Sequence, residues 1–157
     1  MIGINIAETG HVVNVLPPVS TAGGKTGDIF TMENYAHATI IIQAGATDAD
    51  AGFVTIQSCD DFAAGNAADM VFNYYAETTA AGDTLGARTA AVAATGIDVS
   101  ANDSIMYVIE IDANELPATQ PCIQVSFSAP GGANLMSAVA ILSGSRYAGD
   151  QSATAIA

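Results

Sequence analysis

The stretch "ATIIIQA" at residues 38–44 decides the fold class, because it is a short apolar run that suits a strand. Successive side chains of a strand point to opposite faces, so three consecutive isoleucines place large apolar groups on both. β-Branched residues also favour strands over helices. We therefore predict a central strand that is covered on both of its faces.

Short apolar or alternating runs recur along the rest of the chain, bounded by Gly, Pro, Asn, Asp and Ser. Their spacing of roughly 10 to 20 residues is typical of a sandwich or a barrel. The eight or nine candidate strands lie in "IGINIA", "HVVNVL", "IFTME", "ATIIIQA", "GFVTIQSC", "DMVFNYYAE", "SIMYVIEID", "CIQVSFS" and "SAVAILSGSRY". The pattern predicts one all-β domain over residues 1–157.

Two features qualify this assignment. Pro17 and Pro18 follow "HVVNVL", and we expect them to stop that strand because proline cannot continue a central ladder. The alanine-rich stretch 61–70 is interrupted by a glycine and reads as a loop, whereas 87–95 suits either a helix or a strand.

Charge excludes several classes of partner. Sixteen acidic residues face three basic ones, which gives a net charge of −13. Such a chain is repelled by nucleic acid and by anionic membranes. The acidic surface serves solubility, or else some carboxylates face a basic partner. No apolar run is long enough to span a membrane, and the first residues do not read as a signal peptide, so we expect Cys59 and Cys122 to be free thiols.

Three motif-like stretches do not carry a cofactor or metal site. "GGKTG" at 23–27 lacks the earlier glycine of a phosphate-binding loop and reads as a turn. "TDADAG" at 47–52 lacks the spacing and the closing Glu of a calcium loop. "CDD" at 59–61 has no second Cys or His at ligand spacing. We therefore predict no cofactor and no metal.

Catalytic candidates are equally few. The histidines are His11 and His37, and neither can be given a nucleophile or a partner base from the sequence. His37 is interpreted as a packed or hydrogen-bonded histidine at a strand end. Glu110 and Asp112 lie two residues apart on one strand face and are interpreted as a solvated strand end rather than a glycosidase pair. We predict that the chain is not an enzyme.

Several segments, in order and over nearly the whole chain, resemble a family of small virion proteins of tailed bacteriophages. They are "AETGHVVNVLPPV", "DIFTMENYAHATIII", "VTIQSCDDF", "YYAETTAAGDTLGA", "MYVIEIDANEL" and "AVAILSGSRYAG". We place the family with the head decoration, or cement, proteins, which sit on the capsid exterior. The segments that carry the resemblance are structural rather than catalytic.

The resemblance implies a single-domain antiparallel β-sandwich, jelly-roll-like, with an N-terminal arm at residues 1–10. It implies a structural role, in which the protein bridges neighbouring capsomers of the major capsid protein and stabilises the shell. It further implies a homotrimer located on the virion surface, and in the host cytoplasm during assembly. Candidate partner-contact residues are Ile2, Ile4 and Ile6 in the arm, and Arg146 and Tyr147 near the C-terminus.

Some alternatives stay open. The run at residues 2–7 can be the first strand of its own sheet instead of an arm. The protein can also be a tail-tube or head–tail joining subunit. A secreted glycan-binding module is a third reading, although it requires an export signal and exposed aromatic residues.

Overall fold

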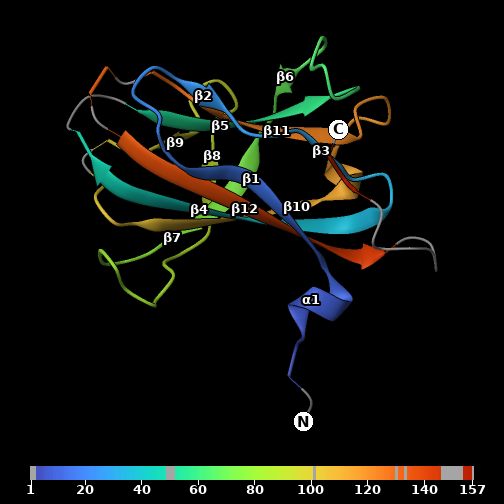
Figure 1. The fold of residues 1–157 in the computed structure, drawn as a ribbon, viewed down its shortest axis with the longest axis horizontal. Helices are drawn as coiled ribbons and strands as arrows, with labels where there is room; N and C mark the ends of the chain where they lie inside the picture. Colours follow the sequence, from blue (N-terminus) through green and yellow to red (C-terminus); the bar gives the residue numbers. More distant parts are fainter. Residues whose placement is uncertain are drawn as a thin grey trace.

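The chain forms two antiparallel sheets packed face to face, as the two layers in Figure 1 show. The computed structural model describes residues 3–48, 52–100, 102–129, 131–132, 134–145 and 154–156. Helix within these residues is confined to a single turn, α1 (Ile6–Thr9), and a short 3-10 helix, η1 (Ala113–Glu115). The predicted all-β antiparallel sandwich is confirmed.

The first sheet has six strands in the order β1-β12-β4-β10-β7-β8. Their bounds are β1 His11–Ser20, β12 Asn134–Ser145, β4 Tyr35–Thr47, β10 Met106–Asp112, β7 Phe72–Ala76 and β8 Thr89–Ala91. β8 lies in the alanine-rich stretch 87–95, which therefore contributes a strand.

The central position predicted for the isoleucine stretch is confirmed, since β4 lies between β12 and β10. Its two faces differ, however. Ile40 and Ile42 are fully buried against the second sheet, whereas Ile41 points to the outer face and is half-buried. The prediction of cover on both faces was wrong, because no described layer packs on the outside of this sheet.

The second sheet has the order β2-β11-β5-β6, with β3 also paired to β11 and β9 to β5. Its bounds are β2 Lys25–Thr26, β11 Cys122–Phe127, β5 Phe53–Cys59, β6 Ala68–Asp69, β3 Phe30–Thr31 and β9 Ile97–Asp98. Eight of the predicted runs thus contain strands, and the short strands β2, β6, β8 and β9, of two or three residues each, complete the sheets.

The core lies between the sheets and follows from the alternation along each strand. From the first sheet, Ile40 and Ile109 point inward, and from the second, Ile56 and Ile123 do so, all fully buried. Burying an aliphatic side chain of this size contributes about 1.5–3 kcal/mol relative to leaving it exposed. Core packing therefore fixes which face of each strand looks inward and which looks out.

The predicted stop at the two prolines was wrong. β1 continues through Pro17 and Pro18 to Ser20. This is possible because β1 is an edge strand, and because its pairing with β12 is already irregular between Leu16 and Val19. An edge with an interrupted ladder tolerates residues that lack an N–H.

The run at residues 2–7 does not form a strand in its described part. Residues 3–5 have no regular structure, and Ile6 begins α1. This segment stands off the body on the outer side of the first sheet (Figure 1). Its period of two suits a strand, but a strand needs a neighbour to complete its ladder, and the segment pairs with none in the described chain. Residues 3–9 are called the N-terminal arm below.

Candidate functional site

The outer face of the first sheet carries a strip of apolar side chains. Val139, Ile41 and Val108 are aligned in register across β12, β4 and β10, and Val12 on β1 is aligned with Ile141 on β12. Val12 is 53% exposed and the other four are half-buried. Outward positions of an antiparallel sheet that faces water are usually polar. These five residues, called the apolar strip, are therefore a candidate contact surface.

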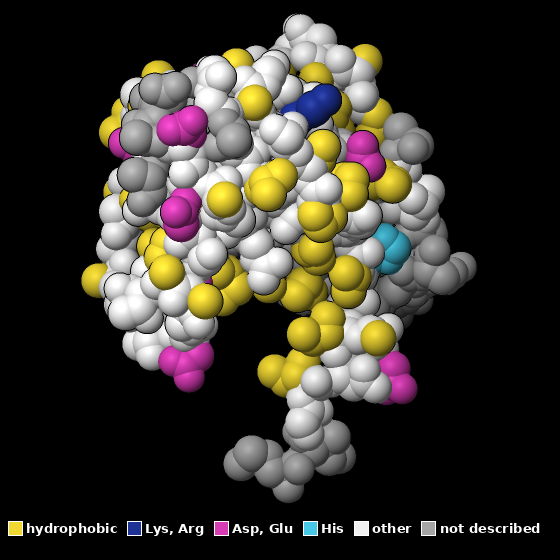
Figure 2. Space-filling view, turned by 60° about the vertical axis from the view of Figure 1, so that its left-hand side comes forward, with side chains coloured by type: hydrophobic (Ala, Val, Ile, Leu, Met, Phe, Trp, Pro, Cys, Tyr) yellow, Lys and Arg dark blue, Asp and Glu magenta, His cyan; other side chains and the backbone are white. Residues whose placement is uncertain are grey.

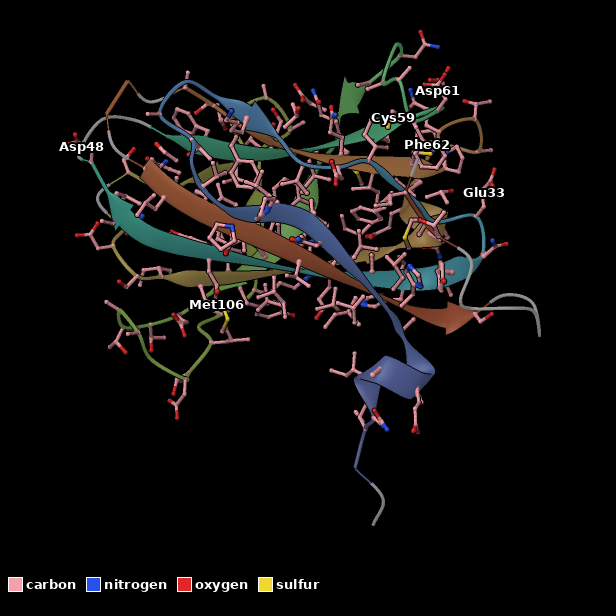
Figure 3. All side chains as sticks on the ribbon, viewed as in Figure 1. Glu33, Asp48, Cys59, Asp61, Phe62 and Met106 are labelled. Carbon is pink, nitrogen blue, oxygen red and sulfur yellow. The ribbon has the colours of Figure 1, made fainter. Side chains whose placement is uncertain are left out.

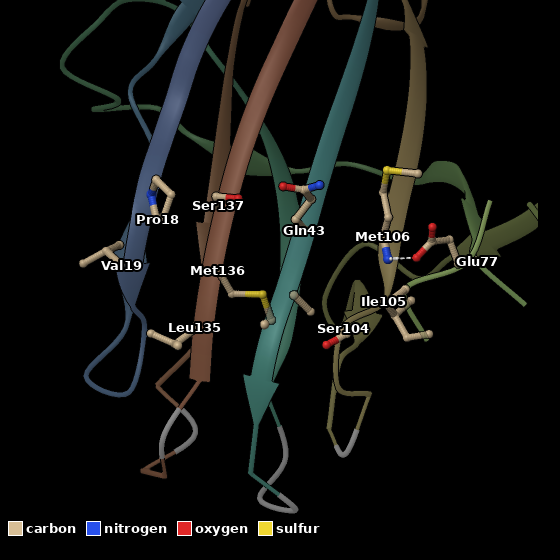
Figure 4. Close-up of a pocket in the computed structure, with 14 residues that line it drawn as sticks. Pro18, Val19, Gln43, Glu77, Ser104, Ile105, Met106, Leu135, Met136 and Ser137 are labelled. Atoms are coloured by element: carbon tan, nitrogen blue, oxygen red, sulfur yellow. Dashed lines mark hydrogen bonds between the residues drawn. The ribbon is translucent and has the colours of Figure 1, made fainter. Parts of the chain in front are cut away.

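At one end of this face the surface is hollowed into an open groove of about 710 Å³. The groove lies over β1, β12, β4 and the start of β10, with loop 77–82 as one wall (Figure 4). Its lining includes Val19, Gln43, Ile105, Met106 and Leu135. We call this hollow the outer groove.

The wall of the outer groove is fixed by a buried carboxylate. Glu77 follows β7 and is 9% exposed, and its Oε2 accepts a hydrogen bond of 2.8 Å from the backbone N–H of Met106. The backbone N–H of Glu77 in turn donates to the carbonyl oxygen of Met106. The side chain of Met106 points away from the second sheet, on the side of the groove (Figures 3 and 4).

At the opposite end of the same face, His37 is held between two carboxylates. Its Nδ1 lies 2.7 Å from Oδ1 of Asp112, and its Nε2 lies 2.7 Å from Oε2 of Glu110. The hydroxyl of Thr39 donates a third hydrogen bond, also of 2.7 Å, to Oε2 of Glu110. β4 and β10 place these groups together, because His37 and Asp112 are partners in the antiparallel register.

The sequence did not predict this cluster. The interpretation of His37 as a hydrogen-bonded strand-end histidine is confirmed, and the structure supplies the two partners that could not be assigned from the sequence. Glu110 and Asp112 are likewise not a merely solvated strand end. The position of Glu110 and Asp112 on one strand face was visible in the sequence, yet only the register of β4 against β10 brings their side chains to His37.

Chemically, the cluster favours the protonated, imidazolium form of His37. Partial burial on its own lowers the pKa of His37. The hydrogen bonds that the ring donates to Asp112 and Glu110, together with the negative charges of these carboxylates, outweigh burial and raise the pKa above its ordinary value. The protonated ring donates through both nitrogens and has no lone pair to act as a base. In this form the ring links β4 to β10 through its two hydrogen bonds and is not a general base.

The two cysteines lie directly opposite each other on β5 and β11. Both are buried and free, as the sequence predicts (Cys59 is labelled in Figure 3, beside Asp61 and Phe62). Burial, and secondarily the neighbouring Cys122, raises the pKa of Cys59 to about 11. Burial also raises the pKa of Cys122. Neither thiol has the low pKa that a nucleophilic cysteine requires.

The predicted partner-contact residues lie at the two ends of the chain. Ile4 is 88% exposed and Ile6 is 43% exposed, both in the N-terminal arm. Ile2, Arg146 and Tyr147 lie outside the described residues. The predicted turn at 23–27 includes β2, and Gly24 there has the positive φ of 75° that favours glycine.

Within the described ranges, no group of three or more His, Cys, Asp or Glu side chains is arranged to hold a metal ion. The same part of the chain contains no helix that is both long and apolar enough to cross a membrane. Neither a protein-family model nor a curated protein matches this chain.

Proposed function

We propose that this chain is a structural virion protein that decorates the outer surface of a tailed-phage capsid and stabilises it by bridging neighbouring capsomers. The observation that carries the proposal is the N-terminal arm, which presents Ile4 and Ile6 to solvent just ahead of β1, the strand that carries Val12 of the apolar strip. Apolar side chains gathered on one side of a small protein mark a protein contact. The sequence resemblance to capsid decoration proteins indicates the kind of partner, the major capsid protein.

The charge of the chain supports an exterior location. A net charge of −13 is repelled by packaged DNA and by the phosphate groups of membranes. A protein of this kind is compatible with the outside of a shell, where it meets only other proteins and solvent.

The proposed work is mechanical. The two-sheet core gives each subunit a rigid body, and the arm and the outer face give it contacts. A homotrimer at a local three-fold position engages several capsomers at once, so that modest contacts per subunit add up to tight attachment through multivalency. The clamped His37 and the two protonated cysteines support this structural role, since none of them is an activated catalytic group.

The test is the copy number of this protein relative to the major capsid protein in purified virions of the phage that encodes it, measured by quantitative mass spectrometry. A ratio near one to one is expected for a protein that covers the head lattice. A few to some tens of copies would assign the chain to the tail or the head–tail joint. Complete absence from virions would overturn a virion role altogether.

A further inference from the structure

We infer that the outer groove and the apolar strip form one docking surface, and that its occupant is a protein segment with apolar side chains flanked by lysine or arginine. The inference rests on the proposed function in one respect, since on a capsid that segment belongs to the major capsid protein. The shape, the polarity and the charge of the surface each contribute to it.

The shape is that of a trough with two raised sides. Loop 77–82 forms one side over the outer groove, and the N-terminal arm stands off the same face of the sheet. Figure 2 shows a hollow between the arm and a second lobe, with hydrophobic side chains along its upper margin and down the arm. The outer groove, with a volume of about 710 Å³, accommodates several side chains of an incoming segment.

The groove and the strip are continuous along the strands. Gln43 and Met106, in the groove, are aligned across β4 and β10, two residues along from the aligned pair Ile41 and Val108 in the strip. On β12, Leu135 in the groove is 49% exposed and lies on the same outward face as Val139. Along the middle of the face, apolar side chains such as that of Ile41 therefore stand next to polar ones such as that of Gln43, and protein interfaces combine both kinds.

The charge of this face selects the partner. Glu8 lies in the arm, and the largely buried Glu77 lines the outer groove. At the other end of the face, Glu110 and Asp112 bring two carboxylates against the single positive charge that His37 can carry. The lysine and arginine of the described chain, Lys25 and Arg88, do not line the groove, and Lys25 lies in the other sheet.

A basic segment is therefore attracted to this face, while an acidic one is repelled. A second copy of this chain, itself at −13, meets like charge here. Complementary charge thus favours a basic partner protein over self-association at this site.

The test uses the full-length chain and empty shells assembled from the major capsid protein of the phage that encodes it, with binding measured by co-sedimentation at several salt concentrations. The test variants are Leu135→Lys, in the groove, and Val12→Lys, in the strip. Both residues are about half exposed, so the substitutions are compatible with folding, which circular dichroism checks. The matched control is Val92→Lys, because Val92 is 65% exposed and lines neither surface.

We expect the two test variants to lose about ten-fold or more in affinity for the shells, as central interface residues do, and the control to bind as the parent does. Binding of the parent should also weaken as salt rises. Equal binding by the parent and the test variants would overturn the docking surface while leaving the decoration role in place.

A second experiment tests the docking surface in the absence of capsid shells. A short synthetic peptide of alternating valine and lysine is titrated into the isotopically labelled chain, with a peptide of alternating valine and glutamate as the control for charge. We expect the valine–lysine peptide to shift the backbone amide resonances of Gln43, Met106 and Ser137, and the acidic peptide to leave them unchanged.

If the parent fails to bind shells but the valine–lysine peptide shifts these resonances, the decoration role falls and the docking surface stands. If the peptide shifts other residues, or both peptides act alike, the inferred partner chemistry is wrong. Self-association that Leu135→Lys abolishes, seen by analytical ultracentrifugation, would show that a second copy fills the groove and would likewise overturn the inference.

Discussion

His37 and Asp112, 75 residues apart in the sequence, face each other across β4 and β10 with Nδ1 and Oδ1 2.7 Å apart. The other ring nitrogen, Nε2, is hydrogen-bonded to Oε2 of Glu110. The histidine therefore connects two residues of β10 to one residue of β4. The cluster lies at one end of the outer face, away from the outer groove. Because the pKa of His37 is raised by this contact, we expect the pairing of these two strands to depend on pH.

The stability of the protein should therefore depend on the protonation of His37. Its folded-state pKa lies above the ordinary value of 6.5, because Asp112 and Glu110 stabilise the imidazolium. A raised folded pKa means that the stabilisation is fully present below the unfolded-state pKa and is lost as pH rises through the folded-state pKa. The measurement is urea unfolding of the parent and of His37→Gln at pH values from below 6.5, the ordinary pKa, to above the raised folded-state pKa.

We expect the free-energy difference between the parent and His37→Gln to shrink as pH rises, and the ring resonances of His37 to titrate above 6.5 in the folded protein. A difference that grows with rising pH would contradict the assignment of the imidazolium. Thr39→Val tests the third hydrogen bond, since it leaves the histidine and both carboxylates in place.

The cysteines should be unreactive in the folded protein. Both are buried, and the pKa of about 11 at Cys59 leaves little thiolate at neutral pH. We expect iodoacetamide to modify neither Cys59 nor Cys122 at pH 7 on a timescale that completes the reaction in urea, as read by intact-mass spectrometry. Rapid labelling of the native chain would contradict their burial.

Gly96 should be intolerant of a side chain. It has a positive φ of 60°, and a Cβ at this position would overlap the carbonyl oxygen of Val54 in β5. The left-handed backbone alone costs an alanine about 1–2 kcal/mol, and the overlap adds to it. Gly96→Ala should lower the unfolding free energy by at least that amount. Gly65→Ala, where a Cβ meets nothing within 4 Å, is the control and should change it little.

Truncating a side chain should destabilise the protein strongly in the core and hardly at all in the arm. Ile40 is fully buried at the centre of the first sheet, so Ile40→Ala should cost about 2–5 kcal/mol of unfolding free energy. Ile4 is 88% exposed, so Ile4→Ala should change stability by less than about 0.5 kcal/mol. Chemical denaturation measures both. A large loss for Ile4→Ala would show that the arm packs on the body.

The sequence predicted the parts of the fold that local alternation controls. The run from Cys122 to Phe127 alternates inward and outward side chains, and its apolar members Ile123, Val125 and Phe127 are buried as expected. The isoleucines of β4 correctly predicted a central strand. Alternation alone did not reveal that the outer face of β4 is left open, because that depends on how many layers the chain builds.

Features that depend on pairing between distant segments could not be predicted. The contact of His37 with Glu110 requires the register of β4 against β10, which no local pattern contains. The stop predicted at Pro17 and Pro18 was wrong because the edge position of β1 depends on which distant strands pair. The N-terminal run has the alternation of a strand but pairs with no edge in the described part of the chain, and Ile6 begins a helical turn instead. The outer groove joins four strands and a loop, and for the same reason it was not foreseen.

The edge strands of the two sheets affect how copies of the protein behave when they are packed close together. β1 carries two prolines at one margin of the first sheet, and β8 at the other has three residues; in the second sheet, β2 and β6 have two residues each. Such margins offer an approaching chain few free N–H and C=O groups in a row, so cross-β stacking into fibrils finds no template there. Copies of the chain held close together should therefore resist polymerisation through their backbones.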